Sequence, residues 1–249
     1  MNKLLIISMI LAGTLLTINS CGEKKVSISY EPSYSAYKTA ESPVIDGILT
    51  DSCWNDAEVK SLVLCKDGKR PLYPTTFRVT YDDRNLYVGF ECQDPDAAST
   101  IMEKDGPIYT QEYISVYIDA GSDSKTYAVI DVAPTGAVND KFVLSYKDGE
   151  REKILSDWDC EGLRTSVSVY GGGAQPGTQD RFWTVELALP FEEFLTAPNI
   201  PPSTEDKWRI NFYRVDLTGR EEYSAFVPTG NENFHKPSGF AWLLFDVEK

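Results

Sequence analysis

Histidine is almost absent from this sequence, because His235 is the one histidine among 249 residues. A zinc site built from three histidines is therefore excluded. A Ser-His-Asp triad would have to use that single histidine, and no Gly-x-Ser-x-Gly turn accompanies it. A glycosidase needs only two carboxylates, but with 38 acidic residues some pair always exists, so the count is no evidence. We predict that the protein is not an enzyme, with a glycosidase as the catalytic alternative.

Basic residues are also few relative to acidic ones. The sequence has 24 Lys and Arg against 38 Asp and Glu, which gives a formal net charge of -14 at pH 7. A protein that binds nucleic acid needs a positive face to meet the phosphates. Nucleic acid is therefore excluded as a partner, whereas a neutral ligand or bound cations suit this charge.

A long apolar run occurs only at the start, from Leu4 to Leu16, and it is too short to span a bilayer. Lys3 precedes this run, and Ile18-Asn19-Ser20-Cys21 follows it and resembles a bacterial lipobox. We expect residues 1–20 to be a lipoprotein signal peptide and Cys21 to be the lipidated first residue of the mature protein. Its lipid would anchor the protein in the bacterial cell envelope, in the outer membrane. The alternative is an ordinary cleaved signal followed by an incidental cysteine.

The rest of the chain contains no segment with the composition of an interdomain linker. No segment rich in Pro, Gly and Ser divides it, and no internal repeat is present. Residues 21–34 are polar and lack an apolar period, which indicates a flexible tether. We therefore expect a single domain over residues 35–249.

Cysteines after Cys21 show no Cys-x-x-Cys spacing, so a zinc site or a redox motif is disfavoured. In an oxidising envelope four cysteines can pair in three ways. The simpler alternative is buried free thiols. Cys92 fits the free-thiol alternative, because Cys92 and Phe90 are two residues apart and share one face of an expected strand. The four residues are Cys53, Cys65, Cys92 and Cys160.

Helical periodicity is scarce, whereas apolar and polar residues alternate in many short segments separated by turn residues. Single helical turns are expected only near Asp51–Ala57 and after Pro190. This pattern predicts an all-β fold, an antiparallel β-sandwich of immunoglobulin-like or jelly-roll-like type with about ten or more strands and few helical turns. The expected strands lie near residues 77–81, 86–92, 114–118, 127–132, 137–144, 165–169, 183–189, 210–215, 223–227 and 240–245.

Five segments occur in a fixed order along the chain. They are Ile45-Asp46-Gly47 with Trp54, Val79–Phe90, Tyr113–Asp119, Arg181–Pro190 and Trp208–Val215. The series resembles the family 9 carbohydrate-binding modules and their relatives, and the resemblance covers about residues 43–247. It implies a β-sandwich that binds an oligo- or polysaccharide without transforming it.

The resemblance also implies sugar-contacting residues beside the third segment and on the strand after it. Matched by position, these are Glu112 and Asp131. Tyr109 stands in the preceding loop, where binding members can place a tryptophan and this chain has none. We expect Glu112 and Asp131 to lie on adjacent strands with their side chains on one open face of the sheet.

Three further residues are candidates for the same site. Arg214 is expected to reach the sheet face of Asp131, where it would orient a ligand or the sheet itself. His235 lies in a stretch that resembles a family "N.H.P" motif, and its imidazole would bond a ligand hydroxyl or pin the loop. Trp158, between two aspartates, offers a stacking surface or closes one end of the sandwich. Trp54 and Trp183 are expected to be structural and Trp208 to lie in the core, and Trp242 is expected on the strand face of Phe240 and Leu244.

No cofactor is predicted. Some family 9 modules bind calcium through oxygen-rich loops, and Asp94-Pro95-Asp96 and Asp119–Asp123 supply carboxylates, but we assign no metal site. Two alternatives to saccharide binding stay open. One is a haem-binding electron-transfer domain with Met102 and His235 as axial ligands. The other is a non-catalytic partner subunit of an envelope complex.

Overall fold

The computed structural model describes residues 31–144, 153–217 and 219–247. Residues from Glu31 onward group into one compact unit. The expected signal peptide, Cys21 and the tether up to residue 30 lie outside the described residues. Within the described ranges, no helix is long and apolar enough to cross a membrane.

The described residues form fourteen strands and four short helical elements. The strands are β1 (Ser33–Lys38), β2 (Lys60–Ser61), β3 (Val63–Leu64), β4 (Thr75–Tyr81), β5 (Asn85–Gln93), β6 (Tyr113–Asp119), β7 (Thr126–Val132), β8 (Val138–Leu144), β9 (Lys153–Leu155), β10 (Arg164–Tyr170), β11 (Phe182–Pro190), β12 (Lys207–Asp216), β13 (Glu222–Ala225) and β14 (Ala241–Asp246). The helical elements are α1 (Ser52–Asp56), η1 (Ile108–Thr110), η2 (Phe191–Glu193) and η3 (Pro237–Gly239).

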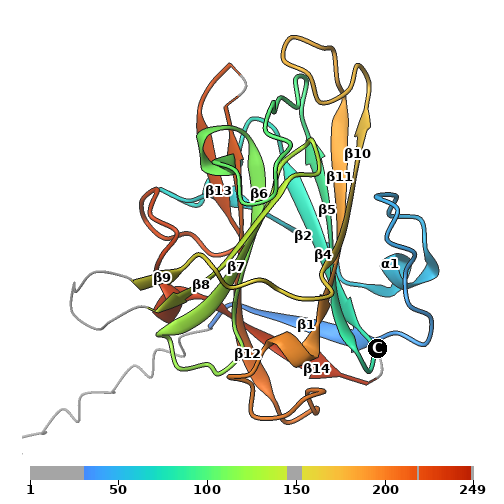
Figure 1. Ribbon diagram of the computed structural model, residues 1–249, viewed down its shortest axis with the longest axis vertical. Helices are drawn as coiled ribbons and strands as arrows, with labels where there is room; N and C mark the ends of the chain where they lie inside the picture. Colours follow the sequence, from blue (N-terminus) through green and yellow to red (C-terminus); the bar gives the residue numbers. More distant parts are fainter. Residues whose placement is uncertain (1–30, 145–152, 218, 248–249) are drawn as a thin grey trace, which may run out of the picture. The chain divides into compact units, whose positions relative to one another are not determined.

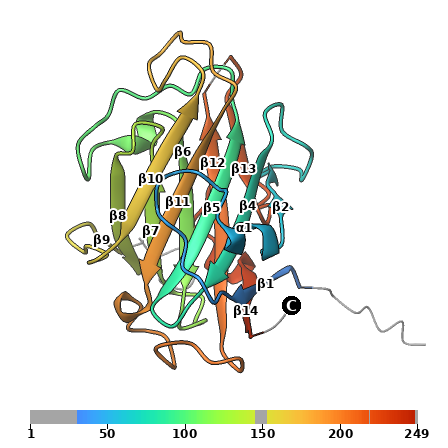
Figure 2. The ribbon, with the colours of Figure 1, turned by 90° about the vertical axis from the view of Figure 1, so that its right-hand side faces the viewer.

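The strands form one curled sheet whose two halves face each other across the core. Its order is β10-β11-β5-β4-β1-β14-β12-β6-β7-β8-β9, and β13 adds to β12. All pairings are antiparallel except those of β1, which runs parallel to β14 and β4. Figures 1 and 2 show β10, β11, β5 and β4 as one layer and β6, β7 and β8 in the other. The predicted β-sandwich is confirmed, as are the helical turns at α1 and after Pro190.

Strand β1 begins before the expected end of the tether. Tyr34 is fully buried, and its hydroxyl donates to the Glu58 carbonyl at 2.5 Å and accepts from the Val79 amide at 2.9 Å. Its neighbours Ser33 and Ser35 are polar, so only Tyr34 and Ala36 carry the apolar alternation. The tether therefore ends earlier than residue 34, because Ser33 and Tyr34 already belong to the sheet.

The inner core fills the space between the two halves of the sheet. Phe77 from β4 meets Phe212 from β12 with ring centroids 4.6 Å apart, and Phe90 from β5 packs beside them. Trp183 and Trp208 are fully buried in this core, as predicted. Aromatic side chains of this size bury large apolar areas, so the core holds the two layers together.

A second apolar layer covers the outer face of β5 and β11. Segment 45–57 crosses that face, and the Trp54 ring packs over Gly89, where a Cβ would meet the indole at 3.4 Å and the Leu49 side chain at 2.6 Å. Glu186 from β11 fastens the segment: one carboxylate oxygen accepts from the Asp46 and Gly47 amides at 3.0 and 2.8 Å, the other from Trp54 Nε1 at 2.7 Å. The first family-like segment and Glu186 therefore serve the fold.

The four cysteines of the domain are buried free thiols. Burial raises the pKa of each to about 12, which keeps the sulfur protonated and unreactive at neutral pH. Of the two alternatives that the sequence left open, the described structure has the buried free thiols and no disulfide among Cys53, Cys65, Cys92 and Cys160.

We predict that Glu186→Ala lowers the free energy of unfolding by about 3 kcal/mol or more, because it leaves the buried N–H groups of Gly47 and Trp54, and the partly buried Asp46 amide, without an acceptor. Chemical denaturation measures this loss. Glu91→Ala on the neighbouring strand is the matched control, and its half-exposed carboxylate should matter by less than about 0.5 kcal/mol. Equal effects of the two substitutions would show that Glu186 does not hold segment 45–57.

Candidate functional site

Alternation along β6, β7 and β12 separates the predicted site residues into two sets. Tyr213, Ser115 and Asp131 are register partners, so they share one face of the sheet. Arg214 pairs with Ile114 and therefore points to the opposite face, into the inner core. The expectation that Arg214 and Asp131 lie on one face is wrong, because their positions in the register differ by one residue.

Arg214 is a buried cross-link between the two halves of the sheet. Its side chain is 1% exposed, and its guanidinium donates to Asp94 Oδ2 at 2.6 Å and to the Gln93 carbonyl at 2.8 Å. It also pairs with Asp216 Oδ2 at 3.0 Å. Removing one partner of such a buried pair costs several kcal/mol, so Arg214 serves the fold rather than a ligand on the outer face.

Glu112 belongs to the same inner side. It is 2% exposed, and its carboxylate accepts from the Leu217 amide at 3.1 Å and from the Ala98 amide at 3.4 Å. The expectation that Glu112 and Asp131 converge on one open face is therefore wrong. Glu112 lines a cleft of about 290 Å³ at one end of the sandwich, but none of that cleft's described lining residues carries an aromatic ring. A sugar-stacking surface is thus missing from that lining.

Three carboxylates of this inner region could hold a cation. Oxygens of Asp94, Glu112 and Asp216 lie within 4.8 Å of one another. The Arg214 guanidinium already bonds two of them, so an arginine supplies the compensating positive charge there. Asp94 therefore has a structural role, and the absence of an assigned calcium site stays a prediction.

The outer face carries a polar cluster in which two of the predicted residues, Asp131 and His235, come together. Asp131 is 3% exposed; it accepts a hydrogen bond from Ser115 Oγ and pairs with Lys141 Nζ at 2.9 Å. Lys141 also donates to Asn139 Oδ1 at 3.2 Å. We call the following residues the outer-face cluster: Ser115, Tyr127, Asp131, Asn139, Lys141 and His235.

His235 is held in this cluster by its ring nitrogen. Its Nδ1 lies 2.6 Å from the Tyr127 hydroxyl, and the imidazole is half-buried. The pKa of His235 is lowered to about 4, mainly by burial and also by the Lys141 charge, while the Asp131 carboxylate acts in the opposite direction. The imidazole is therefore neutral at physiological pH, so one nitrogen accepts and the other donates.

Aromatic rings surround the cluster. Tyr117 stacks on Tyr127 with centroids 5.7 Å apart, and its centroid lies 5.5 Å from that of His235. The rings of Tyr213 and Phe234 stack at 4.1 Å beside them. These four rings are buried, so they pack around the cluster, while its carboxylate, ammonium and imidazole are the polar groups that can bond the hydroxyls of a ligand.

Tyr109 and Trp158 occupy different places. Tyr109 is 71% exposed in η1, next to Ile108, which packs in the same outer apolar layer as Tyr117. The η1 loop that carries Tyr109 therefore packs, through Ile108, in the apolar layer that also contains Tyr127 of the cluster. Trp158 is half-buried, packs against the inner core and lies 5.8 Å from the Phe142 ring. It closes an edge of the sandwich, which was the structural alternative.

The structure also shows the surroundings of two other residues named from the sequence, Asp119 as a possible calcium ligand and Met102 as a possible haem ligand. The Asp119 carboxylate accepts from the Ser124 amide at 2.8 Å and from the Asp123 amide at 3.2 Å, so it shapes the turn after β6. Met102 is 70% exposed, while His235 is bonded to Tyr127. The haem hypothesis and the partner-subunit hypothesis stay predictions.

A family model described as "Carbohydrate family 9 binding domain-like" matches residues 45–241, which span nearly the whole described unit. The chain belongs to this family. The match includes the outer-face cluster and the inner cross-link of Arg214. The resemblance that the five ordered segments suggested is thereby confirmed for the family.

Relatives of this family 9 domain are distant in sequence. An extracellular protein of Arthroderma benhamiae is 25% identical over 194 residues, which cover 71% of this chain and 81% of that protein. A crystal structure from Bacteroides uniformis has a TM-score of 0.71 at 17% identity, covering 87% of this chain and all of the other. A family 9 module of Caldicellulosiruptor kristjanssonii in complex with cellotriose has a TM-score of 0.60 at 17% identity, covering 88% and 95%. The structural likeness establishes the fold.

Sequence reasoning missed four members of the outer-face cluster: Ser115, Tyr127, Asn139 and Lys141. A signal for them exists, because the turn at Pro134–Gly136 closes a hairpin in which Ala133 faces Ala137. Moving two residues away from the turn on each strand places Asp131 opposite Asn139. Lys141 lies two residues further along the second strand, so its side chain is on the same face. Ser115 pairs with Asp131 from the other side, which only the β6–β7 register reveals.

The single histidine allows a direct test of the cluster's electrostatics. We predict that the His235 imidazole signal titrates with a pKa of about 4 in an NMR pH series. Lys141→Met should raise this pKa, and Asp131→Asn should lower it, because each removes one of the named charges. Lys125→Met, on the exposed turn before β7, is the control and should leave it unchanged.

The same titration has a consequence for stability. The folded-state pKa of His235 lies below its unfolded value, so the unfolded chain binds more protons between about pH 6.5 and 4. This group therefore makes the folded state less stable as the pH falls through that window. An imidazole that titrates near 6.5 would contradict the described burial and contacts.

Proposed function

We propose that this family 9 domain binds a neutral saccharide, without transforming it, at the outer-face cluster. The observation that carries the proposal is the Asp131–Lys141 pair beside His235, set among the rings of Tyr117 and Tyr127. The bound sugars named for the Caldicellulosiruptor kristjanssonii modules, glucose and cellotriose, support this ligand class. A gluco-configured oligosaccharide is accordingly the first ligand to test.

The chemistry of the cluster suits sugar hydroxyls. A carboxylate accepts from hydroxyl groups, while an ammonium has three protons to donate, of which Lys141 directs two at Asp131 and Asn139. His235 in its neutral form offers both a donor and an acceptor. Exposed Tyr109 on the neighbouring loop provides a ring for the apolar face of a pyranose.

Charge balance favours a neutral ligand at this cluster. The Asp131 carboxylate and the Lys141 ammonium compensate each other at 2.9 Å. His235 carries no charge near neutral pH, because its pKa is about 4. A ligand with its own charge would disturb this balance in a partly buried place, which costs free energy.

Binding without hydrolysis agrees with the placement of the carboxylates. A glycosidase holds two carboxyl groups on either side of one glycosidic bond. Asp131 points outward and Glu112 inward from neighbouring parts of the sheet, so the two cannot flank a bond of one ligand.

We predict that the purified protein binds cellotriose or a related oligosaccharide in calorimetric titration. Asp131→Asn, His235→Ala and Tyr109→Ala should each weaken binding. For Asp131 the loss should be about ten- to a hundred-fold, since a hydrogen bond to a charged group contributes roughly 1.5 to 3 kcal/mol. Melting temperatures measured on the same samples identify any variant that has lost its fold.

Glu112→Gln is the matched comparison, because it makes the same chemical change on the other side of the sheet. The proposal requires unchanged affinity in this variant. A loss in Glu112→Gln with none in Asp131→Asn would move the ligand to the end of the sandwich. No binding to any glycan of a broad array would remove the proposed function altogether.

The same proposal extends to location: a lipid on Cys21 would place the domain in the bacterial envelope, at the outer membrane, where it meets polysaccharide. The support is the lipobox-like stretch Ile18–Cys21 after the apolar run. We predict that labelled palmitate is incorporated in a bacterial host and that Cys21→Ala abolishes the labelling. Equal labelling of both forms would contradict the anchor.

A further inference from the structure

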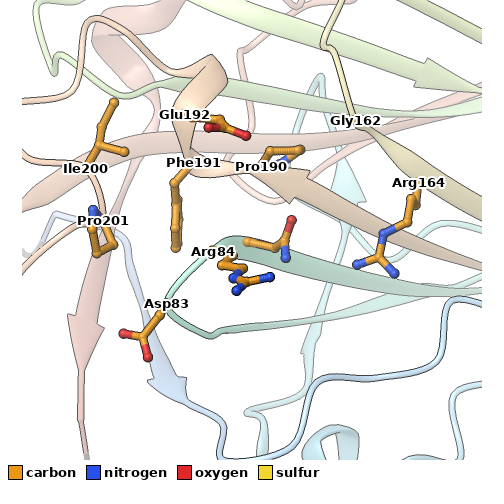
Figure 3. Close-up of a pocket in the computed structure, with 10 residues that line it drawn as sticks. Asp83, Arg84, Gly162, Arg164, Pro190, Phe191, Glu192, Ile200 and Pro201 are labelled. Atoms are coloured by element: carbon orange, nitrogen blue, oxygen red, sulfur yellow. The ribbon is translucent and has the colours of Figure 1, made fainter.

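A second cleft lies at the end of the sandwich where the β4–β5 turn approaches the end of β11 and the start of β10 (Figure 3). Its volume is about 520 Å³, which lies within the range of small-ligand sites. It is built from the other half of the sheet than the outer-face cluster, so the two places are separate. None of its lining residues was a candidate from the sequence.

Two arginines give this cleft its chemistry. Arg84 comes from the β4–β5 turn and Arg164 from the first position of β10, and Figure 3 shows the Arg164 guanidinium directed toward that turn. In the parts of the chain that the structure describes, neither guanidinium forms an ion pair. Two convergent guanidiniums stand out in a chain with a net charge of -14.

The acidic residues that line the cleft form no ion pair with Arg84 or Arg164 in the described part of the chain, so both arginines can bind an anion. The Asp83 carboxylate pairs with Lys38 Nζ at 2.5 Å, on its own side of the turn. Glu192 is the other acidic lining residue, and it is exposed in η2. A bound anion would therefore meet two positive groups against one uncommitted carboxylate.

The rest of the cleft offers an apolar surface. Pro190 and Phe191 line it at the end of β11, and Ile200 and Pro201 line it from the following loop (Figure 3). Phe191 is 1% exposed and Pro190 is buried, so the exposed side chains of Ile200 and Pro201 supply the apolar surface that the C–H face of a pyranose can cover. The cleft thus combines a surface for a sugar ring with two donors for an anionic substituent.

We infer that this cleft binds an acidic saccharide unit, with its carboxylate or sulfate group held by Arg84 and Arg164. The guanidinium fork matches both anions with paired N–H donors. The inference shares only the ligand class with the proposed function and uses none of the outer-face residues. A protein with both sites would hold a polysaccharide that carries neutral and acidic units.

The experiment is calorimetric titration of the purified protein with a hexuronic acid trisaccharide and with its methyl ester. The acid form should bind, and the ester, which has lost the charge but keeps the ring, should bind at least about tenfold more weakly. A sulfated trisaccharide identifies which anion fits better. Inorganic sulfate should compete only weakly, because it lacks the ring.

Arg84→Gln and Arg164→Gln should each weaken binding of the acid form by about tenfold. Arg181→Gln, an exposed arginine at the opposite end of β11, is the matched control and should change nothing. Glu192→Gln should strengthen binding, because it removes a repelling carboxylate.

Asp131→Asn separates the two sites: it should leave acid binding intact, even if the neutral sugar proves to be no ligand. Equal affinity for acid and ester, full competition by inorganic sulfate, or wild-type binding in both arginine variants would each overturn the inference.

Discussion

Side chains that follow one another along a strand point to opposite faces of the sheet, and in β6, β7 and β12 this constraint decides the role of every polar residue. Arg214 faces inward and ties the two halves of the sheet together through Asp94 and the Gln93 carbonyl. Asp131, one register position away, faces outward beside Lys141 and His235. A slip of one residue would exchange the two sets and leave a guanidinium without its partners.

The segments that characterise the family are mostly structural in this chain. Glu186 in the fourth segment binds the Asp46 and Gly47 amides and the Trp54 indole of the first. Gly47 is required there, since its φ is +85° and a Cβ would lie 2.9 Å from Ser168 Oγ. The ordered motifs therefore report a shared way of closing the sandwich. The proposed ligand contacts lie instead with side chains between and beside these segments, so fold similarity alone does not assign a ligand.

The sequence predicted the strands and the two helical turns well, because apolar alternation and turn residues are local signals. It missed the short strands β2, β3 and β9 and the single turns η1 and η3. It also missed β1, whose serines hide the pattern around Tyr34. The candidate site was predicted only in part. Asp131 and His235 do meet, whereas Glu112 and Arg214 lie on the other face, since face assignment needs the register between strands. The arginine cleft could not be predicted, because Arg84 and Arg164 are far apart in sequence and no local pattern relates them.

The central claim is that a saccharide binds the outer face of β6, β7 and β8. The most direct measurement is a two-dimensional NMR titration of labelled protein with cellotriose, with the shifts mapped on the sheet. The account predicts the largest changes at Asp131, Lys141 and the His235 imidazole, with little change at Asp94 or Arg214. Changes confined to the inner-core residues or to the ends of the sandwich, with the outer face unmoved, would contradict it.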